Sequence, residues 1–267
     1  MIDMNGKYIL KILSYLLMVI ALVIFFLFLI LDISIFKPSY VTNRFKKDNY
    51  YEIVFNNIKE NFSKELSNVN IDDSIIQDVI TIDIVKEDID NYVKSFYKKD
   101  AFILHSLEIE EDMDLKINKY LTDNKIIIES KKEISLALDN MIKSYEDGVT
   151  SSNYLNDISS NFYTIRNSST FIMIITIITA LVTYLLLLFI FKVKPLGKVF
   201  MATSTIIILF ELYMQGKVVR FSFNNQYIIA IYKNIYNDIL MKMLLVGILL
   251  FIAGLIFFIF ERLFKKN

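Results

Sequence analysis

A run of 20 uncharged residues, from residue 12 to residue 31, constrains this chain more than any other feature. Twenty residues of α-helix are about 30 Å long, which matches the hydrocarbon core of a bilayer. Because no small-residue cleavage site follows the run, we expect a signal anchor that is retained rather than a signal peptide that is removed. Hydrophobic residues make up 55% of the 267-residue chain and gather in such blocks, which is typical of integral membrane proteins.

Three further spans are expected, at residues 170–191, 199–216 and 242–260. The third is the weakest, because its uncharged run from Val199 covers only 12 residues before Glu211 interrupts the apolar stretch. A spanning helix remains the favoured interpretation, with Glu211 near the membrane surface, and the alternative is a re-entrant hairpin.

The charges of the short connections predict the orientation of these spans. The turn at 192–198 carries three lysines and no acid, and the tails at 1–11 and 261–267 are also basic. Lysine and arginine accumulate in cytoplasmic loops, so we expect a multi-pass protein of the cell membrane with both termini in the cytoplasm. Residues 32–166 and the loop at 217–241 would then lie outside.

The segment 32–166 differs from the rest of the chain in charge. It holds 25 acidic and 17 basic residues, a net charge of −8, whereas the remainder carries +8. An acidic domain is a poor ligand for nucleic acid, because phosphate contacts require an excess of lysine and arginine. The absence of cysteine excludes disulfides, thiol nucleophiles and cysteine-ligated metals.

Apolar residues recur at a spacing of three to four through most of 32–166, and few stretches alternate as a half-buried strand would. We therefore expect a bundle of five or six helices, and predict the whole chain to be an all-α membrane protein with four spans and a helical-bundle extracytoplasmic domain. The expected helices cover residues 38–67 with an irregularity at 48–49, 72–80, about 82–96, 110–121, 130–148 and 153–166.

Local signals mark several helix ends. Thr81 is expected to cap the helix that follows it, and Ser130 with Glu133 forms a capping-box pattern. Gly148 stands where a C-terminal cap belongs, and Ser168-Ser169-Thr170 can cap the start of the second span.

The outer loop at 217–241 has a helical pattern of its own, with isoleucines at 228, 231, 235 and 239. This pattern predicts an amphipathic helix that extends the fourth span outward. It can lie on the bilayer or pack under the 32–166 domain, and its weakly basic polar face favours packing.

Candidate chemistry is sparse, and we predict no catalytic, cofactor-binding or metal-binding residues. His105 is the one histidine, so it cannot form a metal site by itself. The acidic run at 108–114 is interpreted as a solvated helix start. A calcium loop could begin at Asn68, but Asp73 and Val79 occupy the positions that require glycine and glutamate.

Two further features lie in or near the spans. Glu211 is the one acid near a span, and an interfacial or loop-facing position is favoured over a proton pathway. Gly247 and Gly254 are seven residues apart and share a helix face, which indicates a close helix contact within the bundle or in a dimer.

The layout of one span, a large outer domain and three further spans resembles the FtsX-like permeases in topology. Those proteins present a longer cytoplasmic segment between the second and third spans than the seven residues 192–198. Around Tyr50-Tyr51-x-x-Val54 and from Ile71 to Ile89, some 50 residues also resemble four-span membrane proteins of low-GC Gram-positive bacteria. That second resemblance implies the class of protein and no activity.

The sequence therefore predicts a non-enzymatic membrane protein whose 32–166 domain binds, scaffolds or senses a component of the cell envelope. Its expected partners are the lipid bilayer and a protein at that domain. The alternative is a permease-like subunit of a transport complex.

Overall fold

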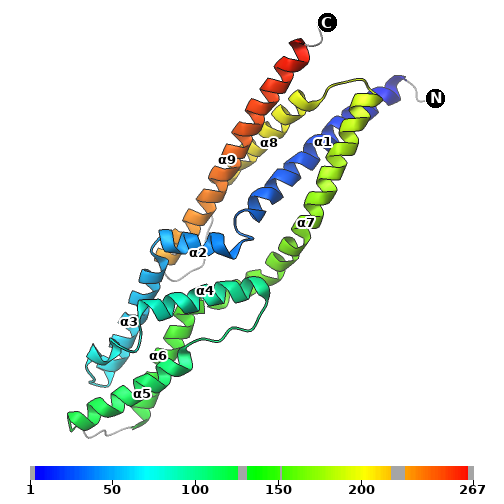
Figure 1. Ribbon diagram of the computed structural model, residues 1–267. Helices are drawn as coiled ribbons and strands as arrows, with labels where there is room; N and C mark the ends of the chain where they lie inside the picture. The colour runs from blue at the N-terminus through cyan, green and yellow to red at the C-terminus, as the bar shows by residue number, and fades with distance from the viewer. Residues whose placement is uncertain (1–3, 126–130, 151, 218–225, 264–267) are drawn as a thin grey trace. The chain divides into compact units, whose positions relative to one another are not determined.

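The computed structural model describes residues 4–125, 131–150, 152–217 and 226–263, and within these ranges the chain is helical and contains no strand (Figure 1). The chain divides into two compact units. The apolar unit comprises Met1–Lys37 and Thr164–Asn267, and the polar unit comprises Pro38–Tyr163.

Four helices contain stretches long and apolar enough to cross a membrane. They are α1 (Met4–Asp32), α7 (Ser152–Phe189), α8 (Leu196–Gln215) and α9 (Gln226–Leu263). The apolar stretches cover Gly6–Asp32, Phe162–Phe189, Leu196–Gln215 and Ile229–Leu263. The predictions of an all-helical chain and of four candidate spans are confirmed, and the chain has the make-up of a multi-pass membrane protein.

The third candidate span is one unbroken helix of 20 residues, as expected for a spanning helix. Because α8 begins at Leu196, the connection after α7 is shorter than the predicted turn at 192–198. The prediction that Ser168-Ser169-Thr170 caps a helix start is wrong. These residues lie inside α7, where the Ser169 hydroxyl donates a hydrogen bond to the Arg166 carbonyl at 2.6 Å.

The predicted helical extension before the fourth span is present, since α9 runs without a break from Gln226. Two of its isoleucines, Ile231 and Ile235, are buried, with 2% and 8% of their surfaces exposed. Ile228 lies outside the residues whose side chains are described.

The apolar unit is centred on α8 and α9, which lie side by side (Figure 1). Buried residues of α1, α8 and α9 meet in one cluster that includes Ile30, Ile207 and Leu240. A second cluster joins α1, α7 and the start of α8, and includes Met18, Leu187 and Val199.

The polar unit contains the first part of α7 and, among its described residues, five complete helices and one short turn of 3₁₀-helix. They are α2 (Pro38–Lys47), α3 (Tyr50–Asn68), η1 (Asp73–Ile76), α4 (Ile82–Lys98), α5 (Ser106–Asp123) and α6 (Lys131–Thr150). Its centre is formed by α3, α4 and α6, which contact one another, while α5 packs on α6 and η1. Completely buried side chains in this core include Phe62, Leu66, Val85, Met113 and Met141.

Several predicted helix boundaries in the polar unit are confirmed. The expected irregularity at 48–49 separates α2 from α3, and Asn49 has a left-handed φ of 53°, which asparagine tolerates better than most residues. Thr81 caps α4, because its hydroxyl accepts a hydrogen bond from the Ile84 amide at 3.3 Å. The helix predicted at 72–80 is shorter than expected and is a single 3₁₀ turn capped by Asp72.

The assignment of Gly148 as a C-terminal cap is wrong. The helix α6 continues to Thr150, and Gly148 instead lies where α6 meets α3. A Cβ atom on this residue would lie 3.0 Å from Cγ1 of Ile58, so the glycine permits close packing. Ser130, the first residue of the predicted capping box, lies outside the described residues.

Candidate functional site

Among the described residues of the polar unit, one carboxylate is completely buried, that of Asp88 on α4. Asp88 lies three residues after Val85 and directly before Ile89. Val85 and Ile89 are core residues, with 0% and 1% of their surfaces exposed. At 100° per residue, position 88 falls on the same inward face as these two. The helix therefore carries a charged group into the core.

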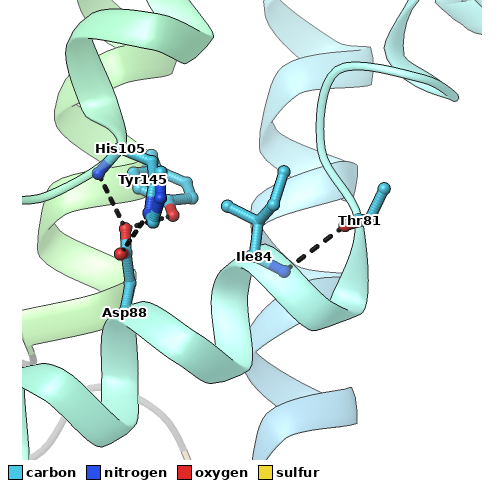
Figure 2. A network of polar contacts seen from close by, with 5 residues as sticks. All are labelled: Thr81, Ile84, Asp88, His105 and Tyr145. Carbon is cyan, nitrogen blue, oxygen red and sulfur yellow. Dashed lines mark hydrogen bonds and ion pairs between the residues drawn. The ribbon is translucent and has the colours of Figure 1, made fainter.

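Three groups from two other segments contact this carboxylate (Figure 2). The backbone amide of His105 donates to Oδ2 at 3.0 Å, and Nδ1 of the His105 ring lies 2.6 Å from Oδ1. The hydroxyl of Tyr145 on α6 donates to Oδ2 at 2.6 Å. These contacts join the middle of α4 to the start of α5 and to α6.

The network offsets a large desolvation cost. An isolated carboxylate is expensive to bury, and it persists in a core only when hydrogen bonds or opposite charge replace its water. Tyr145 is itself fully buried, so its hydroxyl would lack a partner without Asp88. Burial and the hydrogen bond to Asp88 both raise the pKa of Tyr145, which keeps this side chain a neutral donor.

His105 has a different position from the other two members, because 32% of its side chain is exposed. Its hydrogen bond to Asp88 raises its pKa above the ordinary value, an effect that desolvation partly opposes. An aspartate–histidine pair is two thirds of a catalytic triad. In the described part of the chain, however, no nucleophile is hydrogen-bonded to the ring's Nε2, and the observed contacts brace three helices.

The raised pKa of His105 predicts that the stability of the polar unit depends on pH. A group whose pKa is raised on folding contributes its full stabilisation below its unfolded pKa, about 6.5 for histidine, and loses it as pH rises through the folded value. We expect the melting temperature of the full chain in detergent to fall as pH is raised from about 6.5 through that value.

The substitution His105→Gln should flatten this part of the pH profile. The matched control is Lys116→Gln, which removes an ion pair between Lys116 and the exposed Asp78 and should leave the slope unchanged. If the melting temperature of His105→Gln still falls with pH as steeply as that of the unaltered protein, His105 is not the group responsible.

The predicted acidic run lies along α5, which begins at Ser106, four residues earlier than expected. Glu108, Glu111, Asp112 and Asp114 are all exposed, in agreement with a solvated helix start. No group of three or more potential metal ligands occurs among the residues that the structure describes.

Glu211 is completely buried on α8, on the same face as the buried residues Ser204 and Ile207. Its position near a membrane surface stays a prediction. Its Oε1 accepts a hydrogen bond from the side chain of Gln215, while Oε2 has no hydrogen-bond partner. The face of α8 that packs against neighbouring helices therefore includes an acid. The location of Glu211 near the end of the apolar stretch did not indicate that its side chain is buried.

The shared face of Gly247 and Gly254 is a helix contact, as expected, and α8 is the neighbour. A Cβ on Gly247 would lie 2.6 Å from Cγ1 of Ile208, and a Cβ on Gly254 would lie 2.9 Å from the backbone nitrogen of Met201. A third close contact, at Gly197, is not predicted by the sequence, which places this residue in the turn at 192–198. A Cβ there would lie 2.6 Å from the backbone nitrogen of Phe258.

The sequence also missed Asp88 and Tyr145 as partners of His105. The burial of Asp88 could have been suspected, because this charged residue lies among the apolar positions on one face of α4. Comparison with known proteins adds no further site, since no protein-family model, curated protein or solved structure matches the chain.

Proposed function

We propose that the chain is a non-enzymatic protein of the cell membrane whose polar unit lies outside the cytoplasm and binds a component of the cell envelope. The charge distribution supports this topology, because the short connection and the tails beside the candidate spans are basic while 32–166 has a net charge of −8. A protein of this kind acts through its largest hydrophilic part, and here that part is the polar unit.

The solvent-exposed surface of α5 is the main observation that supports this proposal. This surface, called the α5 face, holds two leucines among four acids. It consists of Leu107, Glu108, Glu111, Asp112, Asp114 and Leu115. At 100° per residue these six positions fall within a sector of about 160°. Leu107 and Leu115 are 69% and 67% exposed, so large apolar groups stand in water between carboxylates.

A surface of this composition fits a partner with the complementary chemistry. Leucines on the partner-facing side supply apolar contact, and surrounding carboxylates steer and orient a basic ligand. The residue Ile103, just before α5, is 87% exposed and adds to the apolar area. We infer that the partner is a protein segment with lysine or arginine beside apolar side chains.

The alternative of a permease-like subunit receives less support from the connection between α7 and α8. An ATPase would have to bind there, and only residues 190–195 separate the two helices. For this reason binding by the polar unit is the preferred function.

A single-cysteine experiment tests topology and binding together, because the chain contains no cysteine of its own. Cysteine replaces Leu115, and intact cells are treated with a membrane-impermeant maleimide that carries a photoreactive group. We expect labelling without lysis and, after illumination, one dominant adduct. Cysteine at Lys194 is the control for the cytoplasmic side and should react only after lysis.

Two further variants test the chemistry of the α5 face. The double substitution Glu111→Lys with Asp114→Lys should remove the adduct, whereas Asp139→Lys with Glu146→Lys makes the same charge change on exposed positions of α6 and should not. Cysteine at Leu136, which is 58% exposed on α6, should give no such adduct. An equal adduct from Leu136, or labelling only after lysis, would contradict the proposal.

A further inference from the structure

A cavity of about 220 Å³ lies in the apolar unit beside the connection between α7 and α8. Side chains of α7, of that connection and of the last turns of α9 line it. At ~30 Å³ per water, its volume equals that of about seven water molecules, which is the scale of a small polar headgroup.

The cavity contains one cation and one anion that do not pair with each other. Lys194 and Glu261 both line it, and neither forms an ion pair within the described part of the chain. Glu261 is half-buried, and its Oε1 accepts one long hydrogen bond, 3.4 Å, from the Gly197 amide. Each charge therefore retains capacity for a ligand group of opposite sign.

The remaining walls are largely apolar. Leu188 of α7 and Phe257 and Phe260 of α9 contribute apolar side chains to the lining. The two phenylalanines are 39% and 53% exposed, so apolar side chains of the lining reach the surface of the helices. A ligand that fits must be amphiphilic, with an acyl chain next to a headgroup that carries both charges.

We propose that this cavity binds the headgroup of a phospholipid with a phosphate and a primary ammonium, the phosphoethanolamine group. The Lys194 ammonium donates to the phosphate, and the Glu261 carboxylate accepts N–H bonds from the lipid ammonium. Acyl chains follow Leu188 and the exposed phenylalanines. The position agrees with a headgroup layer, because the cavity lies where α7 ends and α8 begins.

The two charges also predict which lipids are rejected. A phosphocholine group keeps the phosphate, but its methylated nitrogen has no N–H bond to donate to Glu261. A phosphoglycerol group has a net negative charge and would place no cation opposite Glu261. The inference does not depend on the orientation of the protein or on the α5 face.

The test uses the full chain purified in a mild detergent. It is incubated with an equimolar mixture of phosphatidylethanolamine, phosphatidylcholine and phosphatidylglycerol with identical acyl chains, and bound lipid is counted by native mass spectrometry. We expect phosphatidylethanolamine to be retained about tenfold more than either competitor, which corresponds to ~1.4 kcal/mol. Mono-, di- and trimethylated analogues should bind progressively less as N–H bonds are lost.

Three variants assign the effect to this cavity. Glu261→Gln should remove the preference for phosphatidylethanolamine over phosphatidylcholine, and Lys194→Gln should lower retention of both. Lys192→Gln is the matched control, since this exposed lysine belongs to the same connection but does not line the cavity. Equal retention of the methylated series by the unaltered protein would overturn the proposal, as would a preference for phosphatidylglycerol or an equal effect of Lys192→Gln.

Discussion

Replacing Gly197 with alanine is expected to separate α8 from α9 and to destabilise the apolar unit. The added Cβ would lie 2.6 Å from the backbone nitrogen of Phe258 and 2.8 Å from its Cα. A backbone inside a helix cannot move aside as a flexible side chain can, so the whole helix pair must shift. Overpacking of this kind costs about 1–3 kcal/mol and sometimes more.

Alanine at the two glycines of α9 should destabilise the protein to different degrees. Gly254→Ala meets backbone atoms of Met201 and Gly197 at 2.9 and 3.0 Å, so its effect should approach that of Gly197→Ala. Gly247→Ala meets the side chain of Ile208 at 2.6 Å and should cost less, because that side chain can rotate.

The control is Gly216→Ala at the end of α8, where the nearest atom is 3.5 Å away and φ is −72°. Thermal unfolding of the full chain in detergent, followed by circular dichroism, measures these effects. For a protein of this size, 1 kcal/mol corresponds to about 2–4 °C in melting temperature, so we expect Gly197→Ala to lower it by roughly 5–10 °C. A loss of the same size in Gly216→Ala would refute the close-contact account.

Replacing Asp88 with alanine is expected to disrupt the polar unit. The substitution leaves the buried hydroxyl of Tyr145 and the backbone amide of His105 without their acceptor. A buried polar group that loses its partner costs about 1–3 kcal/mol, and removal of one member of a buried charged pair costs about 3–5 kcal/mol. We expect a loss of about 3–4 kcal/mol and faster amide hydrogen exchange in α4 and α6 of the full chain.

The smaller change Tyr145→Phe removes one hydrogen bond to a charged group and should cost about 1.5–3 kcal/mol. Combined with Asp88→Ala it should add little, because the hydroxyl no longer has an acceptor, and this non-additivity measures the coupling directly. Asp112→Ala on the exposed side of α5 is the control and should change stability by no more than about 0.5 kcal/mol. Additive losses in the double variant would mean that the two residues act separately.

Periodicity and local chemistry predicted the helical class and several boundaries of this protein. The cap at Thr81 and the break near Asn49 depend only on residues within one turn, so a single sequence contains all the information needed. The same holds for the apolar spans, because an uncharged run of 20 residues has one stable form in a bilayer. Gly148 shows the limit of local reasoning, because its role depends on Ile58 on another helix.

The polar interior could not be predicted in the same way. Asp88 lies 17 residues from His105 and 57 residues from Tyr145, and no local pattern links them. Plotting α4 and α8 at 100° per residue could have shown that Asp88 and Glu211 face inward, since each shares a helix face with apolar core residues. It could not have identified their partners, because hydrogen-bond geometry is set by how helices pack.

Hydrophobicity and charge act over one or a few turns of chain, so the helical class, the number of candidate spans and the separation of acidic from basic segments could all be predicted. Which groups meet depends on the tertiary structure. It placed an acid beneath His105, buried Glu211, brought Gly197 against α9 and left Lys194 and Glu261 on one cavity without pairing them. These contacts join residues distant in the chain, and their energies depend on distances that only packing sets.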